Sequence, residues 1–144
     1  MSLAAYLSGI TLANAGLGLV HGFASPIGGY FDIAHGVICS RLMPPSNKIT
    51  VRKLRSKRTN PEALQKYSIV GSLFAPAESR SQDYLIDHLL DTIASLASEM
   101  KISSLSHFGV TRADLKRIVV GTDNKNNPVV LEKDEMMEVL EISL

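Results

Sequence analysis

The sequence predicts an all-α fold, a multi-helix bundle. Apolar residues recur at three- and four-residue steps along much of the chain, which is the helical period. Runs with the alternating pattern of a β-strand are hard to find. The length of 144 residues, with 45% hydrophobic and 20% charged residues, suits one globular domain. We therefore expect residues 1–144 to form a single helical domain.

The first expected helix runs from Leu3 to Val20. Between its periodic apolar residues stand mostly Ala, Gly, Ser and Thr, so every side is small or apolar. A helix of this kind is usually buried, and we expect other helices to enclose it. The segment from Ser25 to Gly29 contains Pro26 and two glycines and predicts a turn or a change of helix direction, because proline lacks a donor and glycine permits positive φ.

The first 31 residues carry no charged side chain, which raises the question of a membrane span or a signal peptide. The stretch has no basic start, and Asn14, His21 and its glycines leave it only weakly hydrophobic. We expect neither segment and no membrane partner. A single cysteine, Cys39, cannot form an internal disulfide, which fits a cytoplasmic location.

A second helix is expected from Ile33 to Met43, ending at Pro44 and Pro45, because the residue before a proline avoids helical geometry. The basic segment Lys48 to Arg58 contains no aromatic residue. We interpret it as a solvated connector, and rank a nucleic-acid partner last, because such clusters have many false positives. The formal charge of +1 gives no bias toward polyanions.

The remaining helices are predicted from periodicity and from capping residues. The turn residues of Gly121 to Pro128 separate the last two of them. The expected helices are Pro61 to about Leu73, Ser81 to Met100, a short helix from Thr111 to about Val119 with Asp114 completing a capping box, and a terminal helix that begins after Lys133.

Two of the four histidines, His21 and His35, are candidate metal ligands. On one unbroken helix they would stand roughly 21 Å apart, but a turn between them allows both rings to face an ion roughly 2 Å from each nitrogen. From the spacing alone, the two histidines could equally be core residues that occur at this separation by chance. Two ligands are also too few for a catalytic ion, which normally has at least three from the protein. His88, by contrast, is expected to be a packed or half-exposed histidine.

The sequence around these histidines resembles one family. The segments 14–22 (NAGLGLVHG), 26–30 (PIGGY) and 34–37 (AHGV) resemble a motif of the iron-containing (group III) alcohol dehydrogenases, in which two histidines stand at this separation. Residues 122–128, followed by Asp134 and Glu135, are similar to the closing stretch of that family. Glycerol dehydrogenase and dehydroquinate synthase are its relatives.

The resemblance implies that the chain is the helical C-terminal part of a dehydroquinate synthase-like fold. In that family an aspartate and three histidines hold Fe²⁺, or sometimes Zn²⁺, and His21 and His35 match two of them. The other two ligands lie upstream, as does a Rossmann-like domain or subunit that binds NAD(P). The full-length enzyme would oxidise a small alcohol to an aldehyde or ketone, and the 144 residues alone are expected to be inactive.

The resemblance also assigns two weaker candidates. Ser25 stands where the family often has a further histidine near the nicotinamide; a hydroxyl can relay a proton but does not titrate near neutral pH. Leu12 is the candidate substrate-binding residue. The alternative is a catalytically inactive helical domain that serves packing or oligomerisation, and assembly into a homo-oligomer stays open.

Overall fold

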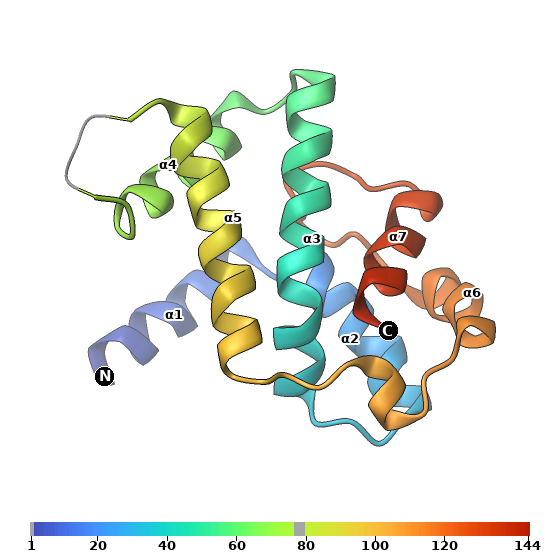
Figure 1. Cartoon of the computed structure of the whole chain (residues 1–144). Helices are drawn as coiled ribbons and strands as arrows, with labels where there is room; N and C mark the ends of the chain where they lie inside the picture. Colours follow the sequence, from blue (N-terminus) through green and yellow to red (C-terminus); the bar gives the residue numbers. More distant parts are fainter. Residues whose placement is uncertain (1, 77–79) are drawn as a thin grey trace.

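The structure is a computed structural model that describes residues 2–76 and 80–144, and all regular elements within these ranges are helical. The long α3 stands at the centre, with α2, α6 and α7 on one side and α4 and α5 on the other (Figure 1). The predicted all-α fold is confirmed. The elements are α1 (Ser2–Ala15), α2 (Leu19–Tyr30), α3 (His35–Lys57), α4 (Pro61–Ser72), α5 (Gln82–Glu99), the 3-10 turn η1 (Leu105–Phe108), α6 (Arg112–Gly121) and α7 (Lys133–Ser143).

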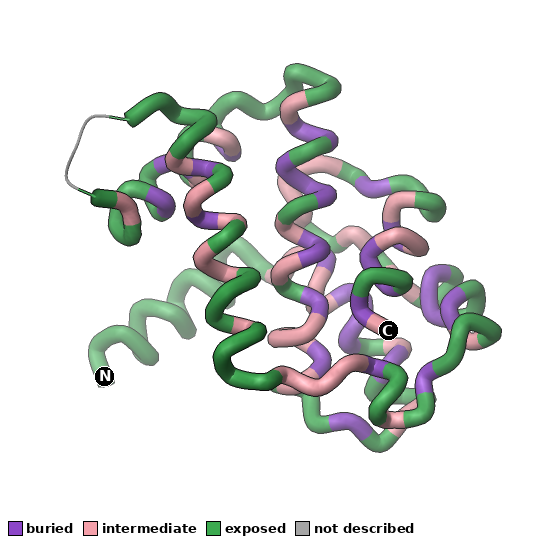
Figure 2. Tube along the Cα trace, viewed as in Figure 1, coloured by how far each residue is buried: buried purple, intermediate pink, exposed green. Residues whose placement is uncertain are grey.

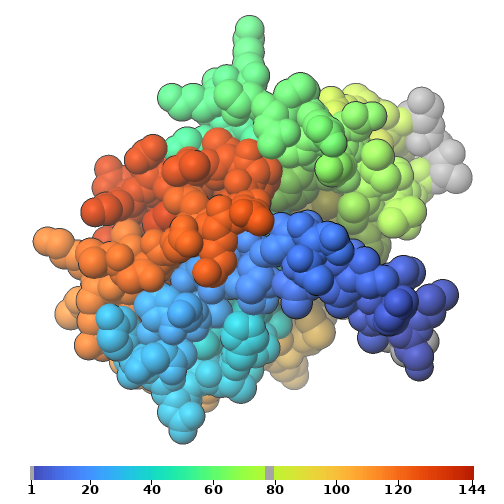
Figure 3. Space-filling model, turned by 180° about the vertical axis from the view of Figure 1, so that it is seen from behind, coloured from blue at the N-terminus to red at the C-terminus, as the bar shows by residue number. Residues whose placement is uncertain are grey.

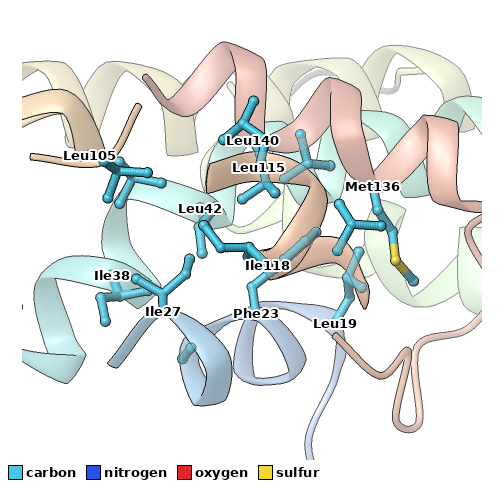
Figure 4. Close-up of a cluster of buried hydrophobic side chains, with 14 of the residues drawn as sticks. Leu19, Phe23, Ile27, Ile38, Leu42, Leu105, Leu115, Ile118, Met136 and Leu140 are labelled. Atoms are coloured by element: carbon cyan, nitrogen blue, oxygen red, sulfur yellow. The ribbon is translucent and has the colours of Figure 1, made fainter. Parts of the chain in front are cut away.

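The main hydrophobic core lies between α2, α3, η1, α6 and α7 (Figure 4). Its side chains recur at helical spacing on the inward face of each element, so burying them fixes how the helices pack. The fully buried side chains at its centre are Leu19, Phe23, Ile27, Ile38, Leu42, Leu105, Leu115, Ile118 and Leu140.

Two polar caps fix the starts of α4 and α5, which pack against each other on the other side of α3. The Asn60 side chain accepts a hydrogen bond from the Ala63 amide (3.1 Å), and the Ser81 hydroxyl accepts one from the Tyr84 amide (3.2 Å). α4 begins at Pro61 and α5 at Gln82, in agreement with the expected starts at Pro61 and Ser81. The apolar side of α5 is only partly buried, since Leu96 stays 45% exposed.

The first helix differs from the expectation in length and in burial. It ends at Ala15 rather than Val20, because Gly16 takes a φ of +70° and turns the chain before α2 begins. None of its residues is buried, and it projects from the edge of the molecule (Figures 2 and 3). The expectation that other helices of this chain enclose it was wrong.

The predicted turn between Ser25 and Gly29 is also wrong. α2 continues through Pro26 and both glycines to Tyr30, and the chain turns only at residues 31–34. Proline removes one helical hydrogen bond, but burial of Phe23, Ala24 and Ile27 on the inward face of α2 outweighs that loss.

Pro44 and Pro45 likewise do not end a helix, because α3 runs through them to Lys57. The residues that were expected to form a solvated connector make the second half of α3, where Ile49, Val51 and Leu54 are buried. These apolar residues recur at helical spacing, which could have predicted the second half of α3. The basic residues between them led instead to the interpretation as a connector.

Three basic side chains of this half of α3 are engaged with acidic groups near or on neighbouring helices. Arg52 binds Glu138 of α7 (Nη1 to Oε1, 2.7 Å), and Arg55 binds Asp87 of α5 (2.7 Å). The Lys53 ammonium contacts the Glu135 carboxylate. The segment therefore ties helices of this chain together.

The ends of α6 and α7 follow the expected capping chemistry. Thr111 and Asp114 form a capping box at the start of α6, as predicted. α7 begins at Lys133, with a second box between Glu132 and Glu135. Within the described residues no single helix is long and apolar enough to cross a membrane; α1 and α2 meet the criteria only as a pair bent by 92°.

Candidate metal centre

The corner between α2 and α3 brings His21 and His35 together. His21 lies in the first turn of α2 and His35 is the first residue of α3, and the two helices pack side by side (Figure 1). Their ring centroids are 5.3 Å apart with an interplanar angle of 46°. The two predicted candidates therefore face a common space, although the turn that brings them together is at residues 31–34 rather than around Pro26.

The glycines beside the two histidines have different roles. Each histidine is followed by a glycine, Gly22 after His21 and Gly36 after His35. A Cβ at Gly36 would meet nothing within 4 Å, whereas a Cβ at Gly22 would overlap the backbone carbonyl of Asp123. Gly22 thus permits close contact between α2 and the loop that follows α6, which helps to hold His21 in place.

Cys39 joins the histidine pair, which the sequence interpretation missed. Its Sγ lies 3.4 Å from the Nε2 of His35, one helical turn earlier on α3. Burial raises the pKa of the Cys39 thiol. The four-residue spacing from His35 to Cys39 on one helix face is the signal that could have found it.

One ligand atom from each of His21, His35 and Cys39 lies within 4.8 Å of the others. Within residues 2–76 and 80–144, no other three His, Cys, Asp or Glu side chains form such a group. Two imidazole nitrogens and one sulfur are ligands that a transition-metal ion of the zinc or iron type accepts. The donor set therefore fits a divalent metal ion, and the exposed His35 leaves one side of the group open.

A cavity of about 350 Å³ adjoins the group, and His21 and Cys39 line one end of it. Ser46 and Thr50 of α3 line it further along. The hydroxyl of Ser46 is buried and has no hydrogen-bond partner in the described structure. An unsatisfied buried hydroxyl favours a polar group in the cavity, so the space beside the histidines suits a small polar molecule.

The other sequence-derived candidates lie apart from this group or face outward. Ser25 stands one turn after His21 on α2 and is exposed. Leu12 is 49% exposed and lines a separate cavity with Gly16 and Asn126. His88 bonds through Nε2 to the carbonyl of Phe74 (3.1 Å), in keeping with the expectation that it is no ligand.

The fold and this corner define an all-helical domain with a cluster of potential metal ligands at the junction of two consecutive helices. A model of the C-terminal part of the Fe-containing alcohol dehydrogenase family matches residues 1–144. The chain belongs to the iron-containing alcohol dehydrogenase family and corresponds to its C-terminal domain.

Known proteins similar to the chain are dehydrogenases and reductases. It is 46% identical over 44 residues to lactaldehyde reductase of Escherichia coli (strain K12), covering 31% of the chain and 12% of the relative. It is 41% identical over 44 residues to the NAD-dependent methanol dehydrogenase of Bacillus methanolicus, again covering 31% of the chain and 12% of the relative.

The fold is similar to that of a solved 1,3-propanediol oxidoreductase. The TM-score is 0.79 at 24% identity, and the match covers 96% of this chain and 35% of that one. The chain therefore spans about an eighth of the length of these two curated relatives and about a third of the solved structure.

Proposed function

We propose that this chain is the metal-binding helical part of an NAD(P)-dependent alcohol dehydrogenase. The observation that carries the proposal is the pair of imidazoles, whose centroids lie 5.3 Å apart at the α2–α3 corner. These histidines are also the two that match the family's histidine motif. A chance pair of core histidines has no reason to combine that match with convergent rings.

In the proposed enzyme, His21 and His35 hold a divalent ion through neutral ring nitrogens. When bound, such an ion supplies Lewis acidity to the alcohol group, so that hydride can pass to the nicotinamide. The corner of α2 and α3 fixes the directions of both rings, and the adjoining cavity admits a small alcohol or aldehyde beside them. Ser25, one turn after His21 and exposed, is proposed as a proton relay.

The rest of the proposed enzyme lies outside this chain. A Rossmann-like domain or subunit would bind NAD(P), and further ligands would come from the same part. α1 supports this division, because its exposed side chains include Leu3, Leu7 and Ile10, and none of its residues is buried. An apolar helix with no cover in its own chain suits a surface that another part of the protein covers.

A chimera tests the proposal. The chain would replace the corresponding C-terminal third of 1,3-propanediol oxidoreductase, which supplies the remaining domain. We expect NAD(P)-dependent alcohol oxidation from the chimera, its loss in His21→Ala and His35→Ala, and no turnover from the 144 residues alone. The same variants would be made in the protein encoded by the whole reading frame that contains this chain. Metal content and activity that survive both substitutions would contradict the assignment.

The second candidate function is a catalytically inactive packing or oligomerisation domain. The exposed apolar side chains of α1 favour it, because two copies could cover them by pairing. Sedimentation measures the oligomeric state of the 144-residue chain and, combined with metal analysis, distinguishes the two candidate functions. A stable dimer through α1 that retains no metal ion supports the second candidate.

A further inference from the structure

We propose that Cys39 is a third metal ligand from this chain, so that residues 1–144 alone bind a zinc-type ion through two nitrogens and one sulfur. This inference deepens the proposed function and rests on it for the location of the centre. It goes further in naming a sulfur ligand, in preferring Zn²⁺ to Fe²⁺, and in assigning metal binding to the chain without its upstream part.

The spacing of the donor atoms supports the proposal. In a tetrahedral zinc site with N and S ligands at about 2.1 and 2.3 Å, neighbouring donors stand roughly 3.5 Å apart. Cys39 Sγ and His35 Nε2 are already 3.4 Å apart. The largest separation in the group is at most 4.8 Å, so His21 needs to approach by only roughly 1 Å.

The place of Cys39 in the fold favours a ligand over a simple core residue. Two helices supply the donors, His21 from α2 and His35 with Cys39 from α3, so all three meet at one corner. Cys39 is half-buried and packs against the core on one side, while its sulfur contacts His35 on the other. The backbone of both helices holds the donors, which lowers the conformational cost of binding.

The chemistry of the group selects the ion. No carboxylate oxygen belongs to the group in the described residues, which disfavours Mg²⁺ and Ca²⁺. Thiolate and imidazole together suit Zn²⁺ and its spectroscopic substitute Co²⁺. Such a site usually binds Zn²⁺ more tightly than Fe²⁺. Three protein ligands from this chain leave the side of the exposed His35 open, where the proposed upstream ligands and a substrate would approach.

Cobalt binding to the purified 144-residue chain tests the proposal. We expect one equivalent of Co²⁺ to give the visible spectrum of a tetrahedral site together with sulfur-to-cobalt charge-transfer absorption in the near ultraviolet. Cys39→Ser, a nearly isosteric change, should abolish the charge-transfer band and weaken Zn²⁺ binding at least tenfold, with an unchanged circular dichroism spectrum. Absence of cobalt binding, absence of the charge-transfer band, or equal Zn²⁺ affinity in Cys39→Ser would overturn the proposal.

Alkylation provides a second readout that needs no variant. Cys39 is the only cysteine in the sequence, so the rate of its reaction with iodoacetamide reports on this sulfur alone. We expect Zn²⁺ to slow the reaction at least tenfold and a chelator to restore it, whereas an unchanged rate counts against a sulfur ligand. If the chimera is active and depends on both histidines while Cys39→Ser binds metal normally, this inference fails and the proposed function stands.

Discussion

Gly22 of α2 lies against the backbone carbonyl of Asp123, at a distance that leaves no room for a side chain. Asp123 belongs to the loop after α6, and the same loop reaches the start of α2 through the Asn126 amide, which donates to the carbonyl of Leu17 (2.9 Å). The loop therefore supports the turn of α2 that carries His21.

Replacing Gly22 should destabilise the fold. In Gly22→Ala the new methyl group overlaps a backbone oxygen, which cannot rotate away, so α2 or the loop must shift; we expect a cost of about 1–3 kcal/mol or more. Urea unfolding measures it. The matched control is Gly29→Ala in the same helix, where a Cβ meets nothing within 4 Å and alanine should be neutral or stabilising. Equal effects of the two changes would show that the contact with Asp123 is unimportant.

The contact of Lys53 with Glu135 should make stability depend on pH. Burial raises the pKa of Glu135, but hydrogen bonds from the Lys53 side chain and the Glu132 amide, with the nearby positive charges, lower it by more. Because the folded chain holds this carboxyl ionised, its contribution is present above the ordinary pKa of 4.5 and is lost as pH falls through the lowered value.

Glu135→Gln tests this pH dependence. The Lys53 side chain is only 9% exposed, so water cannot replace the lost carboxylate fully, and we expect a loss of about 1–3 kcal/mol at neutral pH that shrinks in acid. Chemical unfolding at a series of pH values measures both effects. Glu62→Gln removes an exposed pair with Lys66 and should cost less than about 0.5 kcal/mol. A loss that is independent of pH contradicts the assignment to Glu135.

The buried phenol of Tyr67 should make the folded chain less stable as the pH rises above about 10. Its hydroxyl donates to the Oδ1 of Asn47 (2.7 Å), and burial raises the pKa of Tyr67 to about 12. Between about pH 10 and this value the folded chain keeps a proton that the unfolded chain loses, so the free energy of unfolding falls as pH rises. Unfolding of the chain and of Tyr67→Phe over this range measures the slope. The two proteins should differ in slope, and parallel curves would count against a buried phenol.

Substitutions in α1 should have little effect on the free energy of unfolding of the 144-residue chain. Leu7 is 52% exposed, so Leu7→Ala is expected to change the free energy of unfolding by less than about 0.5 kcal/mol. In the complete protein, or in the chimera described above, the same change should cost more than about 1 kcal/mol because α1 is covered there. Phe23→Ala, at a fully buried position, should cost about 3–5 kcal/mol in both settings. A Leu7 effect that is equally small in both would contradict the proposed cover.

The sequence was sufficient for the helices whose ends carry caps. α4, α5 and α6 begin at or next to their expected starts, and each has a side-chain cap, from Asn60, Ser81 and Thr111, which is a local interaction. Pro26 and Pro44 were misleading for the opposite reason: both lie within helices whose burial against distant parts of the chain outweighs a lost hydrogen bond. The residues next to a proline in the sequence do not show how deeply its helix is buried by distant parts of the chain.

The candidate site shows the same division. His21 and His35 were found from their motif, and the structure brings them together although the expected turn was misplaced. Cys39 was missed because a single cysteine indicates only that no internal disulfide can form, whereas its position one turn after His35 on α3 puts it at the same corner. The exposure of α1 could not be predicted, since an apolar helix is equally compatible with cover from inside or outside its own chain.

The three side chains at the corner are close in sequence as well as in space, since all fall within residues 21–39. Other ties to α3 are long-range: Arg41 reaches the carbonyl of Ser143, 102 positions away, at 3.0 Å. Closing a short loop costs less chain entropy than closing a long one, so the hairpin of α2 and α3 can nucleate before the C-terminus arrives. On the proposed assignment, a metal ion present during synthesis would meet these three side chains on a nascent chain, and refolding with and without zinc should differ first in the rate of this early step.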